Sequence, residues 1–175
     1  MKRAKKSARI EKKKDTTTSP RQQFAALPWR VSADNGVEIL LATSRDTKRW
    51  VIPKGWPMKR RNSHIVAAIE AQQEAGLHGK IEKEKLGVFA YKKRLPGGGS
   101  VDCLVEVYPL RVERQRKKWP EKYQRVTYWF PFVIAADQVD EPQLREIILA
   151  FGRMILARNF TQAPSNGQSP LPDRP

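Results

Sequence analysis

The chain has 175 residues and a formal net charge of +16, with 39% hydrophobic and 30% charged residues. This composition suits one domain with tails, and no run reaches the roughly 18 apolar residues of a membrane helix, so we expect no membrane span. The single cysteine, Cys103, excludes an intrachain disulfide, and no apolar segment follows the basic N-terminus, so we expect no secretory signal and a reducing, cytoplasmic location. The positive charge favours polyanionic partners: nucleic acids, anionic lipids, nucleotides or other polyphosphates.

Both ends of the chain are predicted to be disordered tails. Residues 1–21 lack apolar periodicity and carry a net charge of +7, which leaves +9 for the rest of the chain. Residues 161–175 hold four prolines among Ser, Gln and Asn residues. The folded domain is therefore expected over residues 22–160.

The domain begins with a predicted β-hairpin. Its strands are expected at residues 22–31 and 37–43, because the Asn35-Gly36 pair between them readily adopts positive φ. A short strand at residues 50–52 should end at Pro53, which cannot donate a backbone hydrogen bond.

A loop at residues 54–62 leads into a predicted helix. Ser63 is expected to cap its N-terminus, and Gly76 is expected just beyond its last turn. Ile65, Val66 and Ile69 supply an apolar stripe at helical spacing between these two residues.

The second half of the domain returns to strands and ends in helices. Strands are expected at 87–94, 101–112 and 124–130, followed by a short helix at 131–138 and an amphipathic helix at 141–158. The order of elements predicts an α+β fold in which a mixed sheet is packed between helices.

The predicted helix after the loop carries two glutamates four residues apart. Glu70 and Glu74 should share one face of that helix, with Gln73 beside them and no Lys or Arg between them. Two carboxylates repel each other, and oxygen ligands suit a small hard cation, so this pair indicates Mg²⁺, with Mn²⁺ as the alternative ion. Such a pair is more often a solvated helix face, so its meaning depends on the residues around it.

The loop before this helix is basic. Ammonium and guanidinium groups suit phosphate oxygens, although a basic loop is usually only solvated. The candidate substrate-binding residues here are Lys54, Lys59, Arg60 and Arg61. Residues 92–94, at the end of a predicted strand, could extend this phosphate-binding surface.

Together, the loop and helix resemble the Nudix box, which reads Gly, five residues, Glu, seven residues, Arg-Glu, an aliphatic residue, any residue, Glu-Glu, any residue, Gly and an aliphatic residue. Laid on this chain without gaps, Gly55 opens the box and Gly76-Leu77 closes it. Glu70 and Glu74 match two of its glutamates. The preceding Trp-Val-Ile-Pro-Lys-Gly resembles the subgroup of diphosphoinositol-polyphosphate and dinucleoside-polyphosphate hydrolases.

Three positions depart from the box. Arg61 stands at the first Glu, Ile69 at the Arg, and Gln73 at the first of the paired Glu residues. In the family the Arg helps to orient the glutamates of the helix. Gln73 offers a carbonyl oxygen but neither negative charge nor basicity. The resemblance therefore leaves a metal site with two carboxylates.

The resemblance implies a hydrolase that cleaves a phosphoanhydride bond in a nucleoside-diphosphate-linked or polyphosphate substrate. Glu70 and Glu74 would bind the metal together with the backbone carbonyl of Gly55, and Gln73 is the third candidate catalytic position. The general base is left open between Glu106 and Glu121, and either residue is more often only a surface carboxylate.

Two alternatives remain open at this stage. One is a catalytically weak or inactive Nudix domain that binds nucleotide, polyphosphate or RNA. The other is a nucleic-acid-binding protein, in which the basic N-terminal tail adds nonspecific contacts. The sequence predicts neither the substrate nor the oligomeric state.

Overall fold

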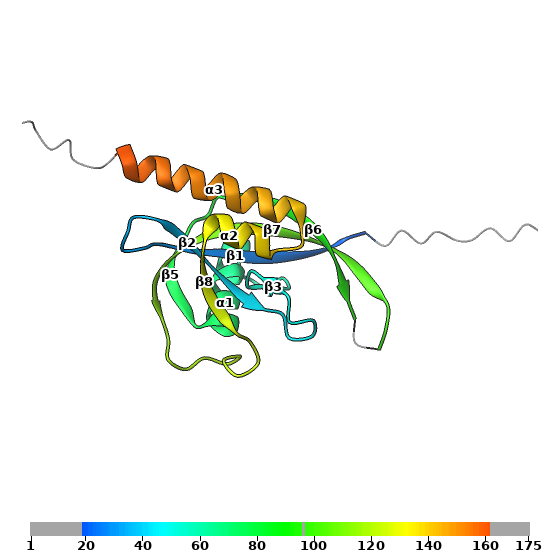
Figure 1. The fold of residues 1–175 in the computed structure, drawn as a ribbon. Helices are drawn as coiled ribbons and strands as arrows, with labels where there is room; N and C mark the ends of the chain where they lie inside the picture. The colour runs from blue at the N-terminus through cyan, green and yellow to red at the C-terminus, as the bar shows by residue number, and fades with distance from the viewer. Residues whose placement is uncertain (1–18, 96, 162–175) are drawn as a thin grey trace, which may run out of the picture.

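The computed structural model describes residues 19–95 and 97–161 (Figure 1). The predicted tails lie outside the described residues except for residues 19–21 and 161. Within the described ranges, no helix combines the length and the apolar character that crossing a membrane requires.

One mixed β-sheet forms the centre of the molecule. Its main path runs β3-β2-β1-β7-β5, with β4 paired to β1, β6 to β7 and β8 to β2. β1 and β7 run parallel, whereas the other pairs are antiparallel. The strands are β1 (Arg21–Val31), β2 (Val37–Thr43), β3 (Trp50–Val51), β4 (Lys54–Gly55), β5 (Leu77–Ile81), β6 (Gly87–Arg94), β7 (Ser100–Gln115) and β8 (Thr127–Pro131).

Helices cover both faces of this sheet, as Figure 1 shows. α2 (Phe132–Gln138) and α3 (Pro142–Thr161) pack on one face, and α1 (Ser63–Ala75) packs on the other. The α+β fold with a mixed sheet between helices, predicted from the order of elements, is confirmed.

The alternation of side chains along β1 divides the core into two clusters. Leu27 and Trp29 point into the cluster that α2 and α3 cover, whereas Ala26 points into the cluster beneath α1. Because both faces are covered, β1 reads as a nearly continuous apolar run rather than a polar-apolar alternation.

Most of the predicted elements are present. The first hairpin pairs Trp29 with Ile39, and Asn35 adopts a positive φ of 61° in its turn. Gly76 ends α1 with a φ of 70°, as its position predicted. The N-terminus of α1 differs from the prediction: Asn62 is the capping residue, without a side-chain capping bond, and Ser63 is already helical.

Two strands, β4 and β5, were not predicted from the sequence. β4 has only two residues and lies in the segment interpreted as loop, where Gly55 pairs with Phe24 of β1. β5 has only five residues, of which Leu77 and Ile81 are aliphatic, and its register is irregular at His78 and Gly79, so its strand pattern is short and weak. A Cβ on Gly79 would lie 1.9 Å from the Arg111 carbonyl oxygen of β7, so β5 depends on close approach to that strand.

The contact between α2 and α3 gives a test of the fold. A Cβ on Gly152 of α3 would lie 2.1 Å from the buried ring of Phe132, so Gly152→Val should lower the free energy of unfolding by about 1–3 kcal/mol through overpacking. Ala157→Val, at an exposed position of the same helix, should change it by no more than about 0.5 kcal/mol. Urea unfolding followed by circular dichroism measures both, and equal effects would contradict the packing.

Candidate functional site

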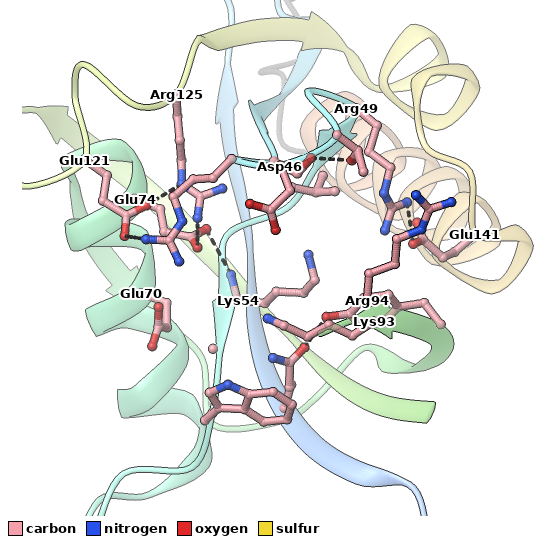
Figure 2. A pocket seen from close by; sticks show the side chains of 18 of the residues that line it. Asp46, Arg49, Lys54, Glu70, Glu74, Lys93, Arg94, Glu121, Arg125 and Glu141 are labelled. Carbon is pink, nitrogen blue, oxygen red and sulfur yellow. Dashed lines mark hydrogen bonds and ion pairs between the residues drawn. The ribbon is translucent and has the colours of Figure 1, made fainter. Parts of the chain in front are cut away.

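A cavity of about 550 Å³ lies where α1 and β4 face the end of β6 and the start of α3. Twelve of its lining residues are charged, seven of them Lys or Arg and five Asp or Glu. Figure 2 shows Glu70, Glu74 and Glu121 on one side, where Arg125 pairs with two of them, and Arg49, Lys93 and Arg94 on the other side together with Glu141. Lys54 lies between the two sides, which are called the acidic and the basic side after their more numerous charges. This layout suits an anionic ligand that brings a cation with it.

The acidic side begins with Glu70, which α1 presses against β4. A Cβ on Gly55 would lie only 1.9 Å from Glu70 Oε1, so the carboxylate occupies the space that glycine leaves empty. Pairing of Gly55 with Phe24 holds this glycine in register with β1. Within the described part of the chain, no hydrogen bond or ion pair engages the Glu70 carboxylate.

Glu74, one turn further along α1, is buried, and each of its oxygens accepts one hydrogen bond. Its Oε1 accepts a hydrogen bond from the Arg125 guanidinium at 2.5 Å, and its Oε2 accepts one from the Lys54 backbone N–H at 3.3 Å. Glu70 and Glu74 therefore face the same cavity, as their spacing predicted, but only Glu70 is left open to a ligand on both oxygens.

The β7–β8 loop (residues 116–126) completes the acidic side. The indole N–H of Trp119 donates to the Glu74 backbone oxygen at 3.2 Å, and the ring lies against Gly76, where a Cβ would approach it to 2.7 Å. The Glu121 N–H donates to the Gln73 backbone oxygen at 3.1 Å. These contacts fix the loop to the end of α1 and bring the Glu121 side chain into the cavity.

Lys54 separates the acidic from the basic side. Its half-buried side chain places the ammonium 5.2 Å from the centre of the Tyr91 ring, and the Tyr91 hydroxyl in turn donates to Gln23 at 2.6 Å. Burial lowers the pKa of Lys54 to about 8, an effect that the carboxylates of Glu74 and Glu141 only partly oppose. Lys54 therefore changes charge close to neutral pH.

Burial also raises the pKa of the two α1 carboxyl groups. Desolvation raises the pKa of Glu74 to about 7 despite the attraction of Arg125 and Lys54. The pKa of Glu70 is raised by the same cause and by the negative charge of Glu121. A nearby cation would lower both values, because it stabilises the ionised form.

The basic side is built around a buried ion pair at the start of α3. Arg49 contacts Glu141 at 2.7 Å, and this glutamate is 7% exposed. The Lys93 ammonium also lies on this side, 5.1 Å from the centre of the Trp56 ring. The Arg21 guanidinium lies over the same ring. Trp56 thus lines the cavity as a support for cationic side chains.

The structure brings together only some of the residues singled out in the sequence. Gly55, Glu70, Glu74 and Lys54 line the cavity, as do residues 92–94. Lys59, Arg60 and Arg61 are exposed in the turn before α1 and are not among the lining residues.

Of Gln73 and the two candidate bases, only Glu121 lines the cavity. The Gln73 side chain is exposed and does not line the cavity, although its backbone oxygen holds Glu121. Glu106 lies outside the cavity, where it pairs with Tyr108 and with Lys85 at 3.0 Å. Of the two candidate bases, only Glu121 reaches the cavity, and there it is paired with Arg125.

Four further charged residues line the cavity although no sequence pattern predicted them: Arg45, Arg49, Arg125 and Glu141. Arg49 and Glu141 are 92 residues apart, and Arg125 and Glu74 are 51 apart, so no local spacing indicates either pair. Only the sheet topology brings these residues together.

A divalent cation fits the acidic side only in part. Glu70 is open beside Gly55, whereas the protein itself engages both oxygens of Glu74. In the described ranges, no group of three or more His, Cys, Asp or Glu side chains is arranged to hold a metal ion. An ion at Glu70 would therefore need further oxygen ligands, which a bound phosphate supplies.

Comparison with known proteins finds sequences that are similar to this chain. No protein-family model matches the chain. Two relatives from Arabidopsis thaliana are Nudix hydrolase 21, chloroplastic, 28% identical over 142 residues, and Nudix hydrolase 4, 29% identical over 138 residues. These matches cover 77% and 75% of this chain and 68% and 65% of the relatives, so the chain spans about two thirds of their length.

Solved structures give the same result for the fold. A binary complex of the C. elegans Ap4A hydrolase matches with a TM-score of 0.60 at 16% identity, covering 78% of this chain and 98% of that one. The NUDIX domain of Shewanella oneidensis NrtR, complexed with ADP ribose, matches with a TM-score of 0.57 at 14% identity, covering 82% and 94%. The chain has the Nudix fold and is similar in sequence to Nudix hydrolases.

Adding one methyl group at Gly55 tests the contact of this residue with Glu70. Gly55→Ala should displace the Glu70 carboxylate from its place against β4, because the new Cβ would overlap it. We expect Mn²⁺ affinity, measured by electron paramagnetic resonance, to fall by at least about fivefold, which corresponds to about 1 kcal/mol. Since the end of a flexible side chain can move, the melting temperature should fall by only a few degrees, about that of a 1 kcal/mol change. Unchanged Mn²⁺ affinity in a folded variant would contradict a role for this contact.

The lowered pKa of Lys54 predicts a pH dependence of anion binding. Below pH 8 the ammonium is charged and attracts phosphate, and above pH 8 that attraction is lost. Affinity for inorganic tripolyphosphate, measured by calorimetry from pH 6.5 to 9.5, should therefore weaken around pH 8. In Lys54→Arg the step should disappear, because a guanidinium stays protonated over this range. An identical pH profile in the variant would show that another group titrates.

Proposed function

We propose that this chain is a Mg²⁺-dependent hydrolase of phosphoanhydride bonds, with Mn²⁺ as the alternative ion. The observation that carries the proposal is the meeting of Gly55, Glu70 and Glu74 at one side of a cavity whose other side is basic. An acidic side for a cation and a basic side for phosphates are the two requirements of phosphoryl chemistry on a polyphosphate. The relationship in sequence to Nudix hydrolases supports the same reaction.

The proposed roles follow from where each side chain lies. Glu70, Glu74 and the Gly55 carbonyl would hold the cation, which offsets the charge that develops on the phosphate oxygens. Lys54, Lys93 and Arg94 would hold the remaining phosphate oxygens and orient the bond to be broken. Water adds to phosphorus and loses a proton, and the bond from that phosphorus to the bridging oxygen breaks, giving two phosphate-containing products.

The proposed substrates are nucleoside-diphosphate-linked or polyphosphate compounds, of the dinucleoside polyphosphate or diphosphoinositol polyphosphate type. Seven Lys or Arg side chains around one cavity support a substrate with several phosphates. The structural neighbours include an Ap4A hydrolase and a domain complexed with ADP ribose. Ap4A and ADP ribose are both nucleotide-type pyrophosphate compounds, the substrate class that we propose for this chain.

A catalytically weak domain that binds such compounds without turnover is the second candidate. The observation that favours it is the engagement of both Glu74 oxygens by Arg125 and Lys54. The acidic side then offers one fully open carboxylate. The two candidates differ in product release and agree in ligand binding.

The deciding experiment is phosphate or nucleotide release from a panel of polyphosphate substrates with Mg²⁺ and with Mn²⁺. Glu70→Gln and Glu74→Gln should each lower kcat by at least about 100-fold, the scale of losing charge stabilisation in a transition state. Glu146→Gln, an exposed change on α3, is the matched control and should leave kcat within twofold. Absence of metal-dependent release from every substrate, with tight binding retained, would favour the second candidate.

Gln73→Glu separates the sequence pattern from the geometry. The box alignment predicts that a restored carboxylate raises kcat. Because the Gln73 side chain is exposed and lies outside the cavity lining, we expect kcat within about twofold of the wild type, as for ordinary surface changes. A large rise would mean that this side chain reaches the metal during turnover.

A further inference from the structure

Arg125 is the most completely engaged charged side chain on the acidic side of the cavity. Its Nη2 donates to Glu74 and its Nε to Glu121, both at 2.5 Å, while its Nη1 donates to the Thr43 backbone oxygen at 2.9 Å. The side chain is 7% exposed. A guanidinium held by three acceptors from separate elements has little freedom to move away.

The backbone on either side of this contact is also fixed. Thr43 and Val126 exchange two hydrogen bonds of 2.9 Å, one between backbone groups and one from the Val126 N–H to the Thr43 hydroxyl. At its other end, the loop is attached to α1 through Trp119 and Glu121. The loop that carries Arg125 is therefore attached to β2 at one end and to α1 at the other.

Among the described residues, Arg125 is the one cation that pairs with both Glu74 and Glu121. α1 carries no Lys or Arg, and Ile69 occupies the helix position beside Glu70. The cation shared by Glu74 and Glu121 therefore comes from a loop 51 residues beyond Glu74, and Arg45 adds a longer contact with Glu121 at 3.6 Å. A divalent ion at Glu70 and Glu74 would lie near a positive charge that already shares one of these carboxylates, and like charges repel.

We propose that Arg125 is a built-in counter-ion of the acidic side, which holds Glu74 and Glu121 in place and keeps metal affinity low until a polyphosphate arrives. The identity of the ion rests on the proposed function. The role of Arg125 is to position the two carboxylates. It couples metal binding to ligand binding, because phosphate oxygens add the negative charge that Arg125 has neutralised. Bound phosphate also supplies the oxygen ligands that Glu74 withholds.

The test is Mn²⁺ binding to the full chain without substrate, followed by electron paramagnetic resonance. Arg125→Gln removes the charge and should raise Mn²⁺ affinity at least about tenfold, a lower limit for removing a nearby like charge from a partly buried site. Arg125→Lys keeps the charge and should remain within about threefold of the wild type. Arg145→Gln removes an exposed charge that pairs with Asp137 outside the cavity, and should have no effect. Unchanged or weaker Mn²⁺ binding by a folded Arg125→Gln protein would overturn the proposal.

A second measurement needs no variant that alters folding. In the wild type, inorganic tripolyphosphate should raise Mn²⁺ affinity by more than the affinity of tripolyphosphate for Mn²⁺ in solution explains, by at least about tenfold. Equal affinities with and without tripolyphosphate, after that correction, would also overturn the proposal.

A Glu70→Gln change made on top of Arg125→Gln locates the ion. Loss of the gain places the added Mn²⁺ on the acidic side, whereas a retained gain places it elsewhere and contradicts the proposal. These results do not depend on turnover. A chain that hydrolyses no substrate but gains Mn²⁺ affinity in Arg125→Gln would refute the proposed hydrolase and leave this inference standing.

Discussion

The pairing of β1 with three strands is the constraint on which the rest of the structure depends. β1 joins β2 along one edge, β7 along the other, and β4 through Phe24 and Ala25. This register sets Gly55 beneath Glu70 and presents Gln23 to Tyr91 on the far side of the cavity. A shift of β1 by one residue would turn its side chains to the opposite core and separate both contacts. The geometry of the cavity is thus a property of the sheet.

Burial and charge oppose each other throughout this cavity. The carboxyl groups of α1 have raised pKa values and Lys54 has a lowered one, because desolvation penalises each charged form. Arg125 limits the cost on the acidic side by sharing its guanidinium between two carboxylates. Groups whose charge is poorly stabilised in the free protein respond strongly when a charged ligand arrives. The same side chains therefore affect both the stability of the fold and the binding of a charged ligand.

The sequence predicts the parts of this protein that local patterns determine. The first hairpin and the end of α1 at Gly76 follow from turn and capping residues, and the shared face of Glu70 and Glu74 follows from helical spacing. β5 could not be predicted, because five residues with a central glycine and a register shift against β7 give too short a strand pattern. Arg125 was missed for a related reason: a salt bridge spanning 51 residues leaves no periodic signal. The exposed position of Lys59, Arg60 and Arg61 depends on the turn before α1, which the basic composition of the loop does not specify.

The parallel pairing of β1 with β7 affects how the molecule reaches its native state. Arg21 lies opposite Cys103, so the two central strands join segments about 80 residues apart in the chain. Closing a loop of that size costs entropy before the contacts repay it, and chains with such distant pairings fold slowly. The β7–β8 loop, which contacts α1 through Trp119 and Glu121, extends directly from β7. The acidic side of the cavity, to which this loop contributes Glu121 and Arg125, therefore depends on a pairing between distant parts of the chain.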